Sequence, residues 1–506
     1  MNYADLFRVT LPETALEIAA LLVLVVDLGL LRKAALNVRA GVAALLGVAG
    51  CAAALWFVIS SGGAGFSFGD ELLLSVGGTA AVAQAGILVL TALTLLLLID
   101  SDFTRHVGEF VAVVLMAATG GLLIAAAQDL LVIFVGLELL SLGLYILTAF
   151  AKRSRKSAES ALKYYLFGGM SAAFLLFGFS YLYGITGSTN LHQVVMGSIM
   201  SGASGGPLLY VAIVMIAAGL GFKVAAVPFH LWAPDTSEGA PAPAAAFIAS
   251  VSKVASFALL ITIGTAILHV FGTNNAVSFV RITSGPPSKY LGMQGPWSLI
   301  LMVLAAASMV LGNLAALAQI SVRRLLAYSA IAHAGYMLLA LAYFSYSPRS
   351  ADAILYYILT YGLTTIGAFG VVGVVERATG SDRLDAFLGL HKRSPMLAAV
   401  LLVLLLSLAG IPPLVGFWAK FNLFAAVLGV AQGVVPFTLV AVAVAASAVS
   451  LYYYLQVLKR AYVMPSVSDT PIKPHPVTLV VLVMIAAAVV VLGVFPALLQ
   501  EWISGF

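Results

Sequence analysis

Four lysines and one glutamate in this sequence stand inside long apolar runs, and they are the residues whose chemistry needs explaining. The lysines are Lys163, Lys223, Lys253 and Lys420, and the carboxyl group is that of Glu138. A charged side chain in hydrocarbon costs between about 2.5 and more than 10 kcal/mol, so it persists only where it faces a protein interior or a wet cavity. The sequence therefore predicts a path for protons or cations across a membrane.

Glu138 and Lys223 have the chemistry of a protonation switch. Burial disfavours the charged form of both groups, whereas close approach of the two favours both charges. Separating them would let the lysine release a proton, and the two would titrate as one coupled pair. The alternative is a static ion pair that only fixes helix packing.

Lys253 and Lys420 are the other two candidates deep in apolar runs, and each could hold or pass a proton. Lys253 is flanked by serines that could hold water, whereas Lys420 follows a predicted helix break. Lys163 is a further candidate for proton transfer. It is predicted to lie about one turn inside its helix, where its stem could instead reach the cytoplasmic surface.

Two histidines could relay protons near neutral pH. His333 is predicted near the middle of a helix and His230 close to a helix end. Each could instead be a hydrogen-bonded core residue. The run Tyr452-Tyr453-Tyr454 is typical of an interfacial aromatic belt rather than of a site.

Prolines interrupt two of the apolar runs close to these lysines. Pro228 follows Lys223 by five residues, and Pro412 and Pro413 precede Lys420. Proline removes a backbone donor and clashes with the preceding turn, so each helix should break and expose polar backbone at membrane depth. Most proline kinks are only structural, but a break beside a buried charge in both halves of a protein points to a transport site.

The elements that must position these residues are membrane helices. The chain is 62% hydrophobic and only 9% charged, which leaves too little polar surface for a soluble domain. Fourteen apolar segments have about the length that spans a bilayer, so the predicted fold is an all-α polytopic membrane protein. They are 14–31, 36–59, 75–99, 107–127, 130–150, 159–184, 207–232, 242–270, 296–319, 324–345, 352–375, 396–428, 435–458 and 477–500.

The other basic residues predict how the helices are oriented. Most lie in loops after odd-numbered helices: Arg32, Lys33, Arg39, Arg105, Lys152, Arg153, Arg155, Lys156, Arg323, Arg324, Arg377, Arg383, Lys392, Arg393, Lys459, Arg460 and Lys473. The opposite side has only Arg8, Arg281, Lys289 and Arg349. By the positive-inside rule the first set is cytoplasmic and both termini face outward. The start resembles no cleaved signal peptide, so the first helix is expected to stay.

An internal repeat appears when the sequence is slid by 192 residues. Gly120 then falls on Gly312, Gly143 on Gly335 and Gly178 on Gly370. The repeat covers helices 4–8 and 9–13, and because five is odd the second copy must be inverted. The predicted regions are 1–106, a first repeat at 107–270, a second at 296–460 and a last helix at 477–506, with the Gly-, Pro- and Ser-rich loop at about 271–295 between the halves.

Several function classes are disfavoured. The net charge of +5 reflects the loop asymmetry, so no nucleic-acid partner is expected. A single cysteine, Cys51, cannot bind an iron–sulfur cluster or a cysteine zinc site. No phosphate-binding Gly-rich motif of the ATPase type is present. The energy for transport must come from an ion gradient or a partner protein.

The motif around the first break resembles a known family. Gly221-Phe222-Lys223, then Pro228 to Asp235 and Glu238 to Pro243, are similar to the antiporter-like membrane subunits of respiratory complex I, most closely subunit N. Leu11-Pro12-Glu13 and Glu159 to Tyr165 resemble it too. By matching motifs, the resemblance assigns the family's four buried charged positions to Glu138, Lys223, Lys253 and Lys420.

This resemblance implies a proton-translocating unit of an NADH:quinone oxidoreductase in a bacterial inner membrane. It implies no cofactor in this chain, and NADH, FMN, iron–sulfur clusters and quinone in partner subunits. The implied partners are the M- and L-type antiporter-like subunits, small membrane subunits, a hydrophilic redox arm and membrane lipids. The alternative is a subunit of a multisubunit sodium/proton antiporter.

Overall fold

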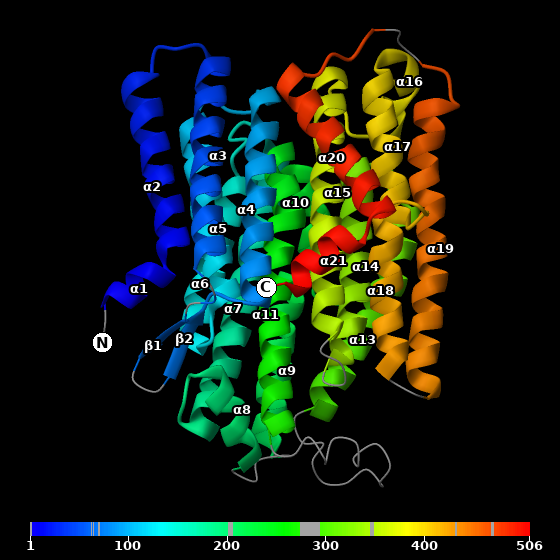
Figure 1. Cartoon of the computed structure of the whole chain (residues 1–506). Coiled ribbons are helices and arrows are strands. Elements are labelled where there is room, and N and C mark those ends of the chain that lie inside the picture. The colour runs from blue at the N-terminus through cyan, green and yellow to red at the C-terminus, as the bar shows by residue number, and fades with distance from the viewer. Residues whose placement is uncertain are drawn as a thin grey trace.

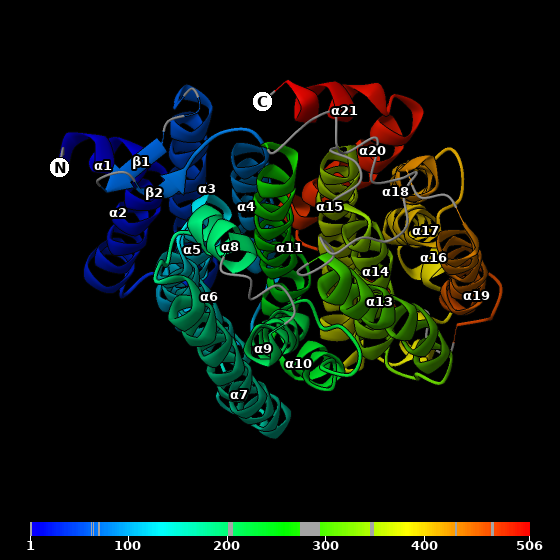
Figure 2. The same cartoon turned by 90° about the horizontal axis from the view of Figure 1, so that it is seen from below.

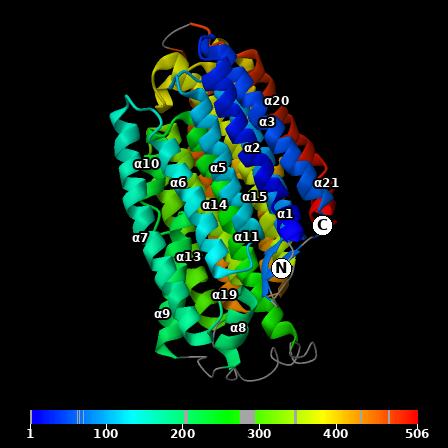
Figure 3. The same cartoon turned by 90° about the vertical axis from the view of Figure 1, so that its left-hand side faces the viewer.

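Long, roughly parallel helices form the whole body of the molecule (Figures 1 and 3). The structure is a computed structural model that describes residues 3–61, 63, 65–68, 71–200, 206–273, 294–344, 349–430, 433–466 and 470–505. The strands seen in this part of the chain form one antiparallel hairpin of β1 (Gly65–Phe68) and β2 (Glu71–Ser75). The predicted all-α membrane fold is confirmed.

The first part of the chain supplies helices from the N-terminus to the middle of the molecule. They are α1 (Tyr3–Val9), α2 (Leu11–Val25, continued by a π-helical turn Val26–Leu30), α3 (Leu36–Ser60), α4 (Thr79–Leu97, continued by a 3-10 turn Leu98–Asp100), α5 (Val107–Ala126), α6 (Leu130–Thr148), α7 (Arg155–Thr186), α8 (Leu191–Met200), α9 (Pro207–Lys223), α10 (Trp232–Gly239) and α11 (Ala242–Thr273).

The second part forms a bundle beside the first, as the view from below shows (Figure 2). Its helices are α13 (Gln294–Leu317), α14 (Val322–Ala342), α15 (Arg349–Thr379), α16 (Leu390–Arg393, after a 3-10 turn Leu384–Phe387), α17 (Pro395–Ala409), α18 (Val415–Val430), α19 (Val434–Tyr462), α20 (Pro476–Val494) and α21 (Ala497–Ser504).

Each predicted apolar segment overlaps one helix or one broken helix. Eleven helices within the described ranges are long and apolar enough to cross a membrane, and α9, α17 and α18 are shorter apolar helices. The count of fourteen crossings stays a prediction. The sequence did not predict the β-hairpin or α8, and α7 begins earlier than expected, at Arg155. Most of the expected loop at 271–295, with Arg281 and Lys289, lies outside the described residues.

Side-chain caps fix where several helices begin. Asp129 accepts hydrogen bonds from the backbone N–H groups of Leu131 and Val132, at 2.8 and 3.3 Å, at the start of α6. Ser154 and Ser321 cap α7 and α14 in the same way. Such caps satisfy N–H groups that a helix leaves free at its first turn, so these short polar connections set the helix starts.

Burial divides the helices into inner and outer ones. The membrane-length windows of α11 and α14 are 100% and 94% buried, whereas those of α7 and α19 are only 33% and 28% buried. The outer helices therefore present apolar side chains to lipid or to partner subunits. A charged group on α11 or α14 must find its polar partners within this chain.

Glycines allow two pairs of helices, one in each half, to approach each other closely. A Cβ on Gly120 would lie 2.5 Å from the backbone N of Leu140, which joins α5 to α6, and a Cβ on Gly312 would lie 2.7 Å from the N of Ala332, which joins α13 to α14. Gly143 and Gly335 make matching close approaches in the same two pairs. Equivalent glycines of the predicted repeat thus have equivalent roles in helix packing.

Connections that carry the basic residues gather at one end of the bundle. The α2–α3 and α19–α20 connections and α16 lie at the top of Figure 1, and the hairpin and α8 lie at the bottom. The grouping predicted from loop charge is therefore present in the fold.

Candidate functional site

The first broken helix, α9, ends at Lys223 in a left-handed cap. Ala226 N donates to Gly221 O at 2.8 Å and Ala225 N donates to Phe222 O at 3.0 Å, the two bonds of a Schellman motif. Ala225 has a φ of +59°, a conformation that costs an alanine about 1–2 kcal/mol. Trp232 Nε1 donates to Phe222 O at 3.0 Å. The break thus satisfies the carbonyls that the helix would have left free.

The second broken helix, between α17 and α18, has the same pattern with a glycine. Ile411 N donates to Leu406 O at 3.1 Å and Gly410 N to Ser407 O at 2.9 Å, while Gly410 has a φ of +88°. Pro412 and Pro413 follow directly, as Pro228 follows the first break. Both predicted helix interruptions are present at these prolines.

Lys223 lies between a carboxylate and a hydroxyl. Its Nζ is 3.9 Å from Glu138 Oε1 and donates to Ser141 Oγ at 2.6 Å, so two successive turns of α6 face the end of α9. The lysine side chain is 8% exposed and that of Glu138 is 30% exposed. The structure brings the predicted pair together, with Glu138 nearer the chain surface.

Lys420 is held by the second break itself. Its Nζ donates to Leu408 O and Ala409 O, each at 2.9 Å, and to Ser447 Oγ at 2.8 Å. The ring of Tyr336 lies 5.6 Å from the ammonium group. The ammonium therefore occupies the C-terminal end of α17, where free carbonyls favour a cation.

Lys253 occupies the middle of α11, the most enclosed helix. Its Nζ donates to Ala330 O of α14 at 2.5 Å and lies 5.6 Å from the centre of the Tyr361 ring. The neighbouring serines donate to carbonyls of their own helix, as Ser256 does to Ser252 O at 2.8 Å. The contacts recorded for this ammonium are thus a carbonyl and an aromatic face.

His333 of α14 joins the surroundings of these two lysines. Its Nδ1 is 2.7 Å from Tyr357 OH, its Nε2 is 3.5 Å from Tyr454 OH, and its ring centre is 4.9 Å from that of Tyr361. Lys253 and His333 both lie beside the Tyr361 ring, and each nitrogen of His333 faces a tyrosine hydroxyl. The histidine is therefore placed between Lys253 and Lys420.

The expectation for the tyrosine run was wrong for two of its three members. Tyr452 is 59% exposed, as a belt residue would be, but Tyr453 and Tyr454 are 2% and 0% exposed. Tyr453 OH donates to Asn313 Oδ1 at 3.0 Å, and Tyr454 OH pairs with Ser329 Oγ. Because α19 crosses against α13 and α14, one face of it points inward.

A small cavity separates His333 from the second break. Its volume is about 10 Å³, close to the minimum for one water molecule. Its lining includes His333, Tyr361, Thr364 and Ser407 together with Leu408, whose carbonyl accepts from Lys420. A small cavity, rather than close-packed side chains, thus lies between the histidine and the end of α17 that holds the lysine.

Lys163 belongs to a different cluster, centred on the short helix α10. Its Nζ is 2.9 Å from Asp235 Oδ2 and 2.7 Å from Glu159 Oε1, and its side chain is 43% exposed. Arg324 contacts Asp235 at 2.6 Å and Glu238 at 3.2 Å, so this α10 cluster ties α7 to α14. Burial tends to raise the pKa of Asp235, but hydrogen bonds from Lys163 and Arg324 outweigh it and lower that pKa.

His230 is not joined to the other candidates. It lies in the connection between α9 and α10, and its ring centre is 6.4 Å from that of Tyr328. Its buried Nδ1 has no hydrogen-bond partner among the described residues. A relay role for His230 therefore has less support than one for His333.

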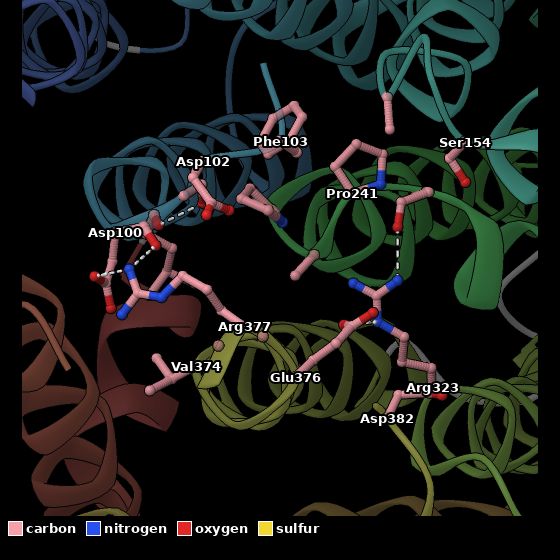
Figure 4. Close-up of a pocket in the computed structure, with 18 of the residues that line it drawn as sticks. Asp100, Asp102, Phe103, Ser154, Pro241, Arg323, Val374, Glu376, Arg377 and Asp382 are labelled. Atoms are coloured by element: carbon pink, nitrogen blue, oxygen red, sulfur yellow. Dashed lines mark hydrogen bonds and ion pairs between the residues drawn. The ribbon is translucent and has the colours of Figure 1, made fainter. Parts of the chain in front are cut away.

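A charged cavity opens where the two halves meet at the basic end of the bundle (Figure 4). Its volume is about 310 Å³, and it is lined by the ends of α4, α11, α14 and α15. Arg323 Nε is 3.0 Å from Glu376 Oε2, while its Nη1 donates to Glu238 O and Ala240 O. Arg377 pairs with Asp100 on the opposite wall.

The sequence did not predict this charged cavity or the buried tyrosines. Arg323 was assigned to a loop, yet it is the second residue of α14 and only 4% exposed. Glu376 stands near the end of an apolar helix and could have been flagged by the rule applied to Glu138. Tyr357 and Tyr361, one turn apart on α15, gave no signal distinct from ordinary core aromatic residues.

Comparisons with known proteins agree with this arrangement. Residues 127–285 and 262–447 match the model of a family described as NADH:quinone oxidoreductase/Mrp antiporter, TM. NADH-quinone oxidoreductase subunit N 2 of Acidobacterium capsulatum is 48% identical over 99% of both chains.

Two solved structures share the fold. A chain of respiratory complex I from Thermus thermophilus with bound aureothin is 34% identical, with a TM-score of 0.76 over 97% of this chain and 98% of that one. A chain of the Mrp complex from a Dietzia species has a TM-score of 0.78 over 99% and 96% of the two chains, at 21% identity. The second likeness concerns the fold alone.

Proposed function

Because this chain belongs to the family of NADH-quinone oxidoreductase subunit N, we propose that it is the proton-translocating membrane subunit of such an enzyme. Its contribution to the enzyme is to move protons, driven by quinone reduction elsewhere in the complex. The chain is thus one part of a translocase, and NADH, FMN, iron–sulfur clusters and quinone belong to partner subunits.

The observation that carries this proposal is the buried line from Lys253 through His333 to Lys420. The contacts of the two ammonium groups are carbonyl oxygens, a hydroxyl and aromatic rings. An ammonium held by neutral acceptors can lose its proton without leaving a buried carboxylate unpaired, which would be costly. Both lysines can therefore alternate between charged and neutral states inside a fixed scaffold.

Glu138 and Lys223 act in the first half of the protein, outside this line. Their separation of 3.9 Å allows each to stabilise the other's charge, and a small movement of α9 would remove that stabilisation. The two predicted repeats, 107–270 and 296–460, would each supply one broken helix and its lysine. Lys163 and the α10 cluster hold the two repeats in register rather than carry protons.

The charged cavity at the basic end of the bundle gives protons access to the path. It surrounds the start of α11, and Lys253 is eleven residues further along, or about 16 Å at 1.5 Å per residue. Arg323 can release Glu376 while it still donates to two backbone carbonyls. The Arg323–Glu376 pair is therefore suited to open when Glu376 takes up a proton.

The expected setting is a bacterial inner membrane with both termini periplasmic. The partners in this setting are M- and L-type antiporter-like subunits, small membrane subunits and the redox arm. A cysteine in place of exposed Val434, in a Cys51→Ser background, should react with an impermeant reagent from outside, and one in place of exposed Lys473 should not. The reverse pattern would overturn the orientation.

Replacement of one buried lysine tests the function directly. In vesicles that contain the assembled complex, Lys253→Met should slow proton transfer through this chain at least ten-fold, the order expected for loss of one proton-transfer group. Lys473→Met, which removes an exposed lysine from a connection, is the matched control. Wild-type proton pumping by Lys253→Met at normal assembly would reject the path.

The rival function is that of a sodium/proton antiporter subunit, which needs no redox partner. Affinity purification from the native membrane distinguishes the two functions. Hydrophilic redox subunits should accompany the chain, and the purified chain in liposomes should show no strong sodium-dependent exchange. The opposite pair of results would favour the antiporter.

A further inference from the structure

A buried acidic side chain lies outside the proposed path, on the first long helix. Glu13 of α2 is 5% exposed, and it faces Gln84 of α4, which is 0% exposed. The carbonyl of Leu122 on α5 completes the group. Helix α5 packs against both α2 and α4, so the group lies where these three helices meet.

The hydrogen bonds around this pair do not balance if Glu13 is ionised. Gln84 Nε2 donates to Leu122 O at 3.2 Å and reaches Glu13 Oε1 at 3.5 Å. Glu13 Oε2 and Gln84 Oε1 are also buried, and neither has a partner among the described residues. Turning the amide would not help, because its oxygen would then face a carbonyl oxygen. The group lacks one donor.

We infer that Glu13 binds a proton and shares it with Gln84 as a neutral acid–amide pair. The added O–H supplies the missing donor, so that the acid donates to Gln84 Oε1 while the amide donates back to Glu13 Oε1. Burial favours this state, because a carboxylate without a cation is expensive to bury. The pair then links α2 to α4 and α5 without any charge.

Burial outweighs the effects that favour a charged Glu13, the largest of which is a hydrogen bond from its own backbone N–H to the carboxylate. Glu13 lies in the first turn of α2, whose dipole favours an anion, but Glu17 one turn further along opposes a second negative charge. The helix α4 has no ionisable residue, and the ionisable residues of α3 and α5 are Arg39 and Cys51, and Glu109, respectively. Arg39 and Glu109 are at the far ends of their helices, and Arg8 of α1 is exposed.

A small hydrophobic cluster covers this end of the helices. It contains Val9, Phe66, Leu74, Val76 and Ala126, from α1, the hairpin, the residue that follows it and the end of α5. On the inner side, a Cβ on Gly121 of α5 would contact Ile87 of α4 and Ala255 of α11, so one packed layer separates the pair from the helix of Lys253. The site should therefore keep its proton rather than pass it along the path.

Infrared spectroscopy of the purified complex tests this inference, and the test does not depend on the proposed function. The spectrum of wild type minus that of Glu13→Gln should contain the C=O stretch of a protonated carboxyl group at neutral pH. Glu17→Gln, which changes an exposed neighbour, should lack this feature. Carboxylate bands in the Glu13→Gln difference would overturn the inference.

A second measurement separates a proton from a metal cation at the same place. Glu13→Gln should retain wild-type assembly and thermal stability, because an amide can replace the neutral acid, whereas Gln84→Leu should lower the melting temperature by several degrees. If sodium chloride stabilised the wild type more than Glu13→Gln, relative to choline chloride, the site would hold a cation and the inference would fail.

Discussion

The two broken helices end in the same backbone motif but hold their lysines differently. Lys223 faces a carboxylate at 3.9 Å, which is partly exposed, and a hydroxyl. Lys420 donates to two carbonyls and a hydroxyl. The first lysine thus depends on a partner whose charge can change, whereas the second depends on fixed dipoles. The proton affinity of Lys223 should therefore change with the charge of Glu138, whereas the surroundings of Lys420 stay the same.

Removing one partner from each lysine should give the largest contrast. Among the described residues, Glu138 supplies the only carboxylate that pairs with Lys223. Glu138→Gln removes it, so proton pumping should fall about ten-fold or more, the effect of losing a group that tunes a proton-transfer site. Ser447→Ala removes one hydrogen bond but leaves the Lys420 ammonium with two carbonyls, so pumping should fall clearly less than in Glu138→Gln.

Proton uptake per NADH oxidised, measured in sealed vesicles, checks both variants. The amount of assembled complex serves as the control. Equal losses in the two variants would show that the halves do not differ in the way proposed.

Backbone substitutions at the two caps should have an intermediate effect. Gly410→Ala places a Cβ at a φ of +88° and 3.0 Å from Lys420 Cδ, so we expect a loss of about 1–2 kcal/mol together with displaced Lys420. Ala225→Gly removes the backbone strain of an alanine at a φ of +59°. It also increases the conformational entropy of the unfolded chain, so the free energy of unfolding should change by less than about 1 kcal/mol. Thermal unfolding of the purified complex, with Gly429→Ala as a control in open space, tests this order.

The α10 cluster should give the smallest effect, because its groups are partly exposed. Asp235→Asn should cost about 1 kcal/mol or less. The lowered pKa of Asp235 means that its contribution is present at neutral pH and is lost as the pH falls below about 4, where the carboxylate takes up a proton. The melting temperatures of wild type and variant should therefore converge in acid. A constant difference down to pH 3 would contradict this assignment.

Charge at membrane depth was the signal that the sequence could give reliably. Glu138, Lys223, Lys253 and Lys420 stood out because water is absent there, and the prolines marked the breaks for the same reason. These features depend on residue type and position along one helix, so a single sequence contains them.

Groups that depend on which face a helix presents could not be predicted. Tyr453 and Tyr454 are the same residue type as exposed Tyr452, and only the packing of α19 separates their roles. Arg323 looked like a loop residue because it follows a polar connection, yet carbonyls from the end of α10 enclose it. Such pairings join residues more than 80 positions apart and have no local pattern.

The complete enclosure of α11 has a consequence for how the protein is made. Lys253 at the centre of a newly synthesised helix opposes entry into lipid by about 3 kcal/mol, and its acceptor, Ala330 O, is synthesised 77 residues later. The surrounding apolar residues of α11 must therefore bring it into the bilayer before its partner exists. Until α14 is in place, that ammonium group lacks the carbonyl that accepts its hydrogen bond in the finished protein.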